Sequence, residues 1–507
     1  MSRSAFRRLP LLGLCLGFIT TLTAIAHAEE PARPADETKL SLDAVIRLAL
    51  EKNFVIKVEA FGPSIAKAGV TEAYGRYDLQ LKGSRQESHS ENPQLTDFVT
   101  GLRPSADVIK TYETALAVEG FLPLGTSYQI GGSTTNQPSS SNNYTSTYTT
   151  FAGVSATQPL LRDFGLNPGL YQIRLARTNL AISEWEYRLS VTNVITQVIY
   201  AYSDLHLAQA YLRSATRSRD MTVQLYNENE GRRKRGAMSE YDVLSARARV
   251  ANREETVLKA MNAVHFAENA LKQLISDEHN FAFLNRPIII EPLPAVIPAA
   301  IDPAEGFVAA LAQRPDYQSA RLGVNKNALT RRYERNQLLP RVDLNGSYGY
   351  NGIGTDAAHS RTDVRNQDYA AYSTGVSVSV PLTSATERGR ARAASLRLRQ
   401  SEADLQRLEQ DILINVSNAA QQVETTQKRV ATTRTARELN EEMLQAELKR
   451  LRAGTGSTFN VLYQQEQLSG AEIAAAEAEA DQRKALAEYD RQTGHTLDAQ
   501  HISLRAD

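Results

Sequence analysis

Cysteine is almost absent from this chain. Of its 507 residues, one is cysteine, one is tryptophan and five are methionine. The single cysteine, Cys15, lies in an apolar run near the N-terminus, and Leu14 before it does not suit a lipid-attachment signal. Once this run is removed, the mature chain has no disulfide and no thiol chemistry, so packing alone must hold the fold together.

An excess of either charge is also lacking. Lys and Arg number 57, and Asp and Glu number 57, so no net charge argues for nucleic acid as a partner. The eight histidines are scattered, with no pair at metal-ligand spacing. No two carboxylates stand out as an acid and base pair. We therefore expect no catalytic residue, no metal site, no cofactor and no enzyme activity.

Long apolar runs are confined to the N-terminus. Three arginines precede an apolar stretch at residues 9–25, and an Ala-His-Ala sequence follows it, ending at residue 28. This order is typical of a cleaved secretory signal. A membrane anchor is the alternative, but glycines and threonines interrupt the stretch. We predict a signal peptide at 1–28 and an N-terminal linker at 29–40, and elsewhere no run reaches the roughly 18 apolar residues of a spanning helix.

What the chain does contain is one order of motifs written twice. The first copy opens at Leu42-Asp43-Ala44-Val45, and the second opens near Pro303-Ala304-Glu305. Each continues with a helix, strands, a strand ending in Pro-Leu, a long helix, a glycine turn and a returning helix. The predicted divisions are a first repeat at 41–286 (strands about 77–160, helical hairpin about 168–275), a Pro-rich linker at 287–302, a second repeat at 303–494 (strands about 341–381, hairpin about 388–492) and a tail at 495–507.

A seven-residue spacing of apolar residues marks the long helices. Val191, Val198 and Leu205 have this spacing in the first copy, and Val416 and Val423 have it in the second. Each stretch runs for about 60 residues without proline, or about 90 Å of helix. Such a repeat makes helices wrap around neighbours, which must supply most of the stability.

The strands alternate between apolar and polar residues. Val376, Val378 and Val380 are separated by serines, which gives one apolar and one polar face. A wall between lipid and an aqueous lumen needs this pattern, although a soluble sandwich also shows it, and we favour the membrane barrel. Polar stretches at about 87–107 and 133–150 are expected to be loops at its mouth. An extra strand pair, about 111–119 and 127–135, either joins the barrel or folds over it.

Glycine turns connect the long helices. Gly236 and Gly454 suit the left-handed residue that closes a helix, and Ser239 and Ser457 suit the cap of the next one. A basic run, 232–235, precedes the first turn. It is either a contact for a partner or a solvated helix end whose cations complement the helix dipole, and we favour the latter.

In this order the motifs resemble those of the TolC-type outer-membrane efflux proteins, the outer membrane factors. The opening motif, the sequence Leu339-Pro340-Arg341-Val342 and the two glycine turns before [Asp/Asn]-Val-Leu carry the resemblance, which spans about 42–494. It implies an α+β membrane protein with two internal repeats. A transmembrane antiparallel β-barrel shared by a homotrimer would continue into a long periplasmic α-helical barrel. In that family each chain gives four strands to a twelve-stranded barrel.

The resemblance also implies a function. Such a protein is the outer-membrane exit duct of a tripartite export system, exported by a cleaved signal peptide and largely periplasmic. It passively conducts substrates from an inner-membrane transporter, and a periplasmic adaptor docks at its hairpin tips. Small-molecule or drug efflux is the first expectation, and type I protein secretion is the second. The alternative is a non-channel periplasmic coiled-coil adaptor or structural protein, which would have one hairpin rather than two.

Site residues follow from the same resemblance. The tip and adaptor-docking residues are expected to be Arg235, Gly236, Ser239, Asp242, Gly454 and Ser457. In the best-known member, aspartates of the second copy narrow the entrance, and here Asn460 and Tyr463 stand at those positions. The tyrosine and arginine that tie that entrance closed correspond to Leu451 and Gly456. With Phe459, the residues Asn460 and Tyr463 form a candidate polar-aromatic constriction.

Overall fold

The computed structural model describes residues 39–95, 99, 101, 106–140, 143–292 and 301–503. From Leu40 onward they belong to one compact unit, Leu40–Asp507. The predicted signal peptide, nearly all of the predicted N-terminal linker, the middle of the Pro-rich linker and the last four residues lie outside the described residues.

Six antiparallel strands form one sheet in simple chain order. The strands are β1 (Gln80–Asn92), β2 (Asp107–Phe121), β3 (Ser127–Asn136), β4 (Tyr148–Pro159), β5 (Arg341–Gly354) and β6 (Tyr369–Ser379). The extra strand pair predicted from the sequence is β2 and β3. It lies inside the sheet, between β1 and β4, so it does not fold over the sheet.

The two predicted polar loops are partly strand, so that prediction was wrong. Residues 87–92 continue β1, with Glu87 opposite Tyr112 and Asn92 opposite Asp107 on β2. Likewise, β3 extends to Asn136 and β4 begins at Tyr148. A ribbon that buries neither face shows no apolar alternation, because backbone hydrogen bonds alone hold it.

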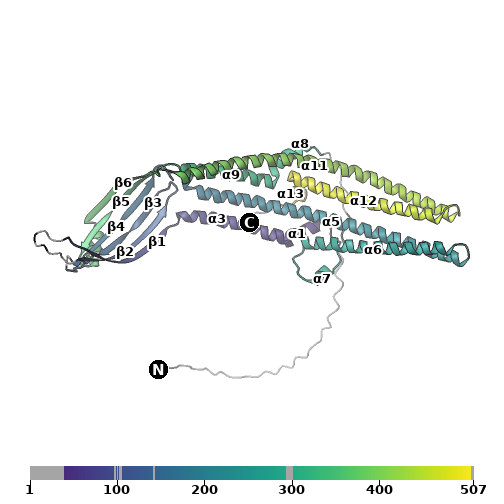
Figure 1. Cartoon of the computed structure of the whole chain (residues 1–507), viewed down its shortest axis with the longest axis horizontal. Coiled ribbons are helices and arrows are strands. Elements are labelled where there is room, and N and C mark those ends of the chain that lie inside the picture. The colour runs from purple at the N-terminus through teal and green to yellow at the C-terminus, as the bar shows by residue number, and fades with distance from the viewer. Residues whose placement is uncertain are drawn as a thin grey trace, which may run out of the picture. The chain divides into compact units, whose positions relative to one another are not determined.

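Two long helical hairpins dominate the rest of the unit. Helix α5 (Tyr171–Lys234) has 64 residues and turns into α6 (Glu240–Ile275). Helix α11 (Ala385–Arg452) has 68 residues and turns into α12 (Thr458–Thr493). Helix α5 packs on both α6 and α12, and α12 packs on α11. The sheet lies at one end of these helices and both turns lie at the other (Figure 1).

Shorter helices make up the rest of the unit. Before β1 come α1 (Leu42–Lys52), α2 (Phe54–Glu59), α3 (Phe61–Tyr74) and the 3-10 turn η1 (Gly75–Tyr77), and before β5 come α8 (Pro303–Gln313) and α9 (Pro315–Asn336). The four remaining short helices are α4 (Leu166–Gly169), α7 (Phe281–Leu284), α10 (Ala357–Asn366) and α13 (Thr496–Ala499). No helix among the described residues is apolar over enough length to cross a bilayer.

Local sequence explains where the two opening helices begin. The Ser41 hydroxyl accepts a hydrogen bond from the Ala44 N–H at 3.2 Å, which caps α1. The Asp302 carboxylate accepts one from the Ala304 N–H at 2.8 Å, and Pro303 takes the first helical position of α8. Both signals are local, so the sequence predicts both starts.

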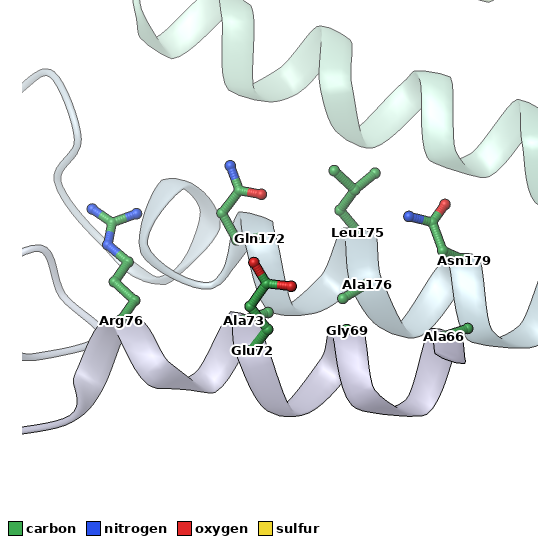
Figure 2. Close-up of a pocket in the computed structure, with 9 residues that line it drawn as sticks. All are labelled: Ala66, Gly69, Glu72, Ala73, Arg76, Gln172, Leu175, Ala176 and Asn179. Carbon is green, nitrogen blue, oxygen red and sulfur yellow. The ribbon is translucent and has the colours of Figure 1, made fainter. Parts of the chain in front are cut away.

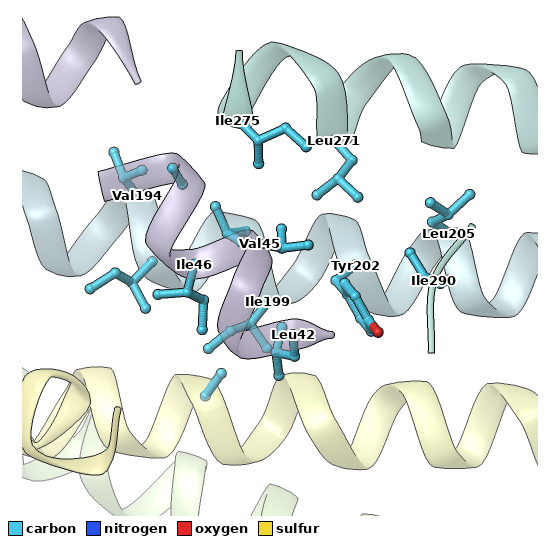
Figure 3. Packing of buried hydrophobic residues seen from close by; sticks show 14 of the residues in the cluster. Leu42, Val45, Ile46, Val194, Ile199, Tyr202, Leu205, Leu271, Ile275 and Ile290 are labelled. Atoms are coloured by element: carbon cyan, nitrogen blue, oxygen red, sulfur yellow. The ribbon is translucent and has the colours of Figure 1, made fainter. Parts of the chain in front are cut away.

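The largest apolar core lies where α1 packs against α5 and α6 (Figure 3). Val191, Val198 and Leu205 are fully buried, as their seven-residue spacing predicts. Burying each such side chain contributes about 1.5–3 kcal/mol. The Tyr202 hydroxyl also contacts the carbonyl oxygens of Leu40 at 3.1 Å and Glu291 at 2.8 Å, which ties these two neighbouring chain segments to α5.

Candidate functional site

The first hairpin turn ends α5 with a left-handed glycine. Gly236 has φ 77°, a conformation that glycine adopts without steric cost. Its N–H donates to the Arg233 carbonyl at 2.8 Å, and the Ala237 N–H donates to the Arg232 carbonyl at 3.0 Å. These bonds satisfy carbonyls that the helix end leaves free. Arg235 is the C-cap residue of α5.

Helix α6 starts at a serine cap that also touches an acid. The Ser239 hydroxyl oxygen accepts from the Asp242 N–H at 3.2 Å, and its hydroxyl lies 2.6 Å from the Asp242 carboxylate. The Arg233 guanidinium, by contrast, binds Glu230 at 2.8 Å and lowers the pKa of that carboxyl. The basic run therefore carries a partly neutralised positive charge.

The second turn repeats this geometry. Gly454 has φ 79°, and its N–H donates to the Leu451 carbonyl at 3.1 Å. The Ser457 hydroxyl oxygen accepts from the Asn460 N–H at 3.2 Å and caps α12. Both turns, which between them hold the six residues predicted for the tip, lie at the same end of the unit (Figure 1).

The candidate constriction residues occupy the first turns of α12. Phe459 and Tyr463, four residues apart on one helix face, are 64% and 53% exposed. Asn460 is engaged instead, because its amide donates to Glu447 at 3.3 Å. The two aromatic side chains are therefore free to line an opening or to meet a partner.

Glu447 of α11 is a site residue that the sequence did not predict. Its side chain is nearly buried and also receives the Arg450 guanidinium at 3.3 Å. Glu447 lies three residues after Leu444 and four before Leu451, which is an inward position of the apolar repeat. A charged residue at such a position is the signal that identifies it. Glu447 thus links the end of α11 to Asn460 at the start of α12.

One face of the sheet carries an apolar belt. Directly paired residues form a row across all six strands, namely Leu81, Val118, Ile130, Val154, Tyr348 and Tyr372. Leu81 is 71% exposed and Tyr372 is 80% exposed. Exposing such a belt to water costs free energy, so we expect it to meet an apolar environment.

The belt ends at a polar row in the same register. Two residues further along the strands, the row is Gly83, Leu116, Gly132, Ala152, Tyr350 and Ala370. Another two residues further, it is Arg85, Thr114, Thr134, Thr150 and Gly352. The apolar face therefore has a defined outer limit that β1 to β5 share.

The opposite face is polar. One row on it consists of Gln80, Glu119, Gln129, Ser155, Ser347 and Ser373. The hydroxyls of Ser347 and Ser373 are 2.7 Å apart, and the Asn345 amide donates to Ser377 at 3.2 Å. Two faces of such different polarity suit a wall with lipid on one side and water on the other.

A cleft of about 440 Å³ lies between α3 and α5 (Figure 2). It is lined by small and polar residues, namely Ala66, Gly69, Glu72, Ala73, Arg76, Gln172, Leu175, Ala176 and Asn179. Across the described part of the chain, no group of three His, Cys, Asp or Glu side chains is arranged to hold a metal ion. The cleft offers helix packing surface rather than a reactive constellation.

Comparison with known proteins gives a consistent result. The family model described as "Outer membrane efflux protein" matches residues 120–276 and 307–495. The outer membrane efflux protein BepC of Brucella suis is 24% identical over 413 residues, covering 79% of this chain and 82% of BepC. The alkaline protease secretion protein AprF of Pseudomonas aeruginosa is 27% identical over 229 residues, covering 44% of this chain and 45% of AprF.

The fold is also that of a solved channel. The crystal structure of the CmeC outer membrane channel of Campylobacter jejuni superposes with a TM-score of 0.66 at 15% identity. The match covers 90% of this chain and 86% of CmeC. The likeness in fold thus covers a larger share of the chain than the family model, which matches from residue 120.

Proposed function

Because the chain belongs to the outer membrane efflux protein family, we propose that it is the outer-membrane exit duct of a tripartite export system. It conducts substrates passively from an inner-membrane transporter through a periplasmic helical tunnel and a β-barrel to the outside. The observation that carries this proposal is the apolar belt across all six strands, opposite a polar face. A signal peptide at 1–28 delivers the chain, and the duct itself catalyses nothing.

A homotrimer closes the duct. Along the hairpins the helices are ordered α6, α5, α12, α11, so α6 and α11 form the edges of this layer. Both edges expose large apolar side chains, such as Leu258 at 66% and Phe266 at 67% on α6 and Leu439 at 55% on α11. If the α6 edge of one copy is complementary to the α11 edge of the next, copies related by rotation about one axis form a closed ring.

The sheet edges lie on the same two sides as the helix edges. Helix α3 leads into β1 and β6 leads into α11, and α3 exposes Phe61 at 65% and Ile65 at 71%. The same threefold rotation therefore closes both the barrel and the helical tunnel. The two repeats, 41–286 and 303–494, each contribute helices, strands and a hairpin to this assembly.

Partners dock at the tips. Arg235, Gly236, Ser239 and Asp242 of the first turn, with Gly454 and Ser457 of the second, form the surface for a periplasmic adaptor. Phe459, Asn460 and Tyr463 form the entrance constriction. Their support is their common location at the end of the unit away from the sheet (Figure 1).

Small-molecule or drug efflux is the first cargo class. BepC, the relative with the larger coverage, is named an efflux protein. Type I protein secretion is the second candidate, because AprF is named an alkaline protease secretion protein. A non-channel coiled-coil adaptor or structural protein has no use for a six-stranded sheet with an exposed apolar belt.

Membrane fractionation with native mass of the detergent-extracted, unboiled protein tests the proposal. We expect a trimer in the outer membrane fraction, with the mature chain starting at about residue 29. A soluble periplasmic monomer would overturn the duct and leave the adaptor or structural role.

A further inference from the structure

Resting on this proposed trimer, we infer that the hairpin of β2 and β3 is part of the barrel wall, so that three copies close an eighteen-stranded barrel. Both strands lie in the interior of the sheet. All thirteen residues of β1 pair with β2, and the ten residues of β3 pair with β2 on one side and with β4 on the other.

The turn of this hairpin is anchored to the helices. The Gly165 N–H donates to the Leu124 carbonyl at 3.1 Å, and the Gly125 N–H donates to the Leu122 carbonyl at 2.9 Å. A Cβ atom on Gly169 would lie 1.9 Å from the Pro123 carbonyl oxygen, so only glycine permits this approach. The hairpin is thereby fixed to the segment that begins α5.

The apolar belt includes one residue from each of the six strands. Val118 and Ile130 continue the row between Leu81 and Val154. Thr114 and Thr134 mark the same outer limit as Arg85 and Thr150. A hairpin that folded over the barrel mouth would not separate lipid from water, so it would not need the same apolar and polar rows.

The two open edges need partners. Strand β1 leaves the helical end of the sheet and β6 returns to it, because six strands alternate in direction. A neighbouring copy therefore brings its β1 antiparallel to β6. The edge strands have 13 and 11 residues, and unpaired backbone groups of this length are not tolerated in a bilayer. The occupant of each edge is a second copy of this chain.

Six strands from each of three copies make eighteen. With strands about 4.8 Å apart and tilted by about 40°, this gives a backbone diameter of roughly 36 Å, against roughly 24 Å for twelve strands. The outer pore is then as wide as a porin and does not sort cargo by size. Selection by size falls to the tip end of the duct, and the barrel admits bulky solutes, including polypeptide segments.

High-resolution electron microscopy of the intact trimer counts the strands directly. We expect eighteen strands with β6 beside β1 of the next copy. A trimer with a twelve-stranded wall and β2–β3 outside it would overturn this inference and leave the exit duct intact. Absence of a trimer from the outer membrane would instead overturn the proposed function.

Cysteine cross-linking tests the closing edges in the same protein. Cys15, the only cysteine, lies in the predicted signal peptide. In the mature chain a disulfide can therefore form only between introduced cysteines. Tyr372→Cys combined in turn with Leu81→Cys, Gly83→Cys and Arg85→Cys should form a disulfide between copies in at least one pair. Tyr372→Cys with Ile130→Cys is the matched control and should form none. Trimers that cross-link only the control pair would refute the edge pairing.

A deletion variant provides a second readout. Removing residues 107–136 excises both β2 and β3. Residues 93–106 and 137–147 then connect β1 directly to β4. The expected product is a trimer with a twelve-stranded barrel about two-thirds as wide. An unchanged width would contradict the inference, and if the variant fails to fold, the strand count of the unaltered trimer decides.

Discussion

Two neighbouring acids near the end of α12 have pKa values shifted in opposite directions. Burial raises the pKa of Asp490 to about 6, and Arg483 only partly offsets this rise. Burial also pushes the pKa of Glu488 upward, but hydrogen bonds from Arg491 and Gln492, both at 2.6 Å, and from Tyr200 lower it below its usual value. Hydrogen bonding therefore decides in which direction the pKa of each acid is shifted.

The Asp490 shift predicts a pH dependence of stability. Because folding raises its pKa, the folded state holds the proton more tightly. The stabilising contribution is complete below the unfolded pKa of 3.8 and is lost as the pH rises through about 6. Two pKa units correspond to about 3 kcal/mol. In Asp490→Asn, the loss of thermal stability between pH 4 and pH 7 should shrink, as measured by the unfolding midpoint of extracted protein.

Glu488→Gln is the matched control for this experiment. The pKa of Glu488 is lowered by folding, so its contribution is present at neutral pH and is lost on acidification. This variant should be destabilised at pH 7 and less so at low pH. An Asp490→Asn protein with the pH slope of the wild type would show that the carboxyl is not protonated in the folded state.

Residues of this kind are hard to predict from sequence. Asp490 resembles any other acid on a long helix, and only its burial distinguishes it. Glu447 is different, since its inward position in the apolar repeat is visible in the sequence once the heptads are aligned. The tip glycines were predictable because a left-handed helix end depends on local chemistry.

At the scale of elements, Gly236→Ala should destabilise the first hairpin turn. The left-handed φ of 77° disfavours a side chain, and the strain amounts to about 1–2 kcal/mol. No atom lies within 4 Å of the position of the new Cβ, so the backbone alone determines the effect. Limited trypsin digestion at the basic run should be about fivefold or more faster, because opening of the turn exposes it.

Gly231→Ala provides the comparison. This glycine lies inside α5, has no atom within 4 Å of an added Cβ and has no positive φ. Alanine there should stabilise the helix by about 1 kcal/mol and slow the same cleavage. Equal acceleration in both variants would mean that bulk near the tip, rather than the left-handed backbone, is responsible.

Elements were predicted unevenly. The hairpin helices α5, α6, α11 and α12 follow the seven-residue spacing, and their starts and ends lie within about three residues of the expected ones. The outer half of β1 was missed because a fully polar strand has no periodic signal. Helix α10 was missed for a related reason, since its ten residues carry little apolar character.

At the scale of the whole molecule, sequence alone left the strand count open. Alternation shows that β2 and β3 are strands, but not which strands they pair with, because pairing partners are set by long-range contacts. The register across six strands resolves this, and with it the width of the proposed barrel. The edges that the proposed trimer would bury are likewise identified only once α6 and α11 are known to be outermost.

Two exposed aromatic side chains begin α12, at the expected entrance of the proposed duct. If Phe459 and Tyr463 of α12 line it, the double variant Phe459→Ala and Tyr463→Ala removes three pairs of aromatic rings from the narrowest ring of a trimer. Single-channel conductance in planar bilayers should then rise severalfold. Asn460 is left unchanged in this variant, because its amide donates to the Glu447 carboxylate at 3.3 Å.

Tyr241 supplies the control, since it opens α6 at the place that Phe459 takes in α12, and it is 79% exposed. If only the second hairpin forms the constriction, Tyr241→Ala should leave conductance unchanged while the trimer and its membrane location persist. Equal increases from both hairpins would mean that the entrance is lined by all six turns. No increase from either would place the narrowest point of the duct away from the tips, where neither aromatic side chain limits flow.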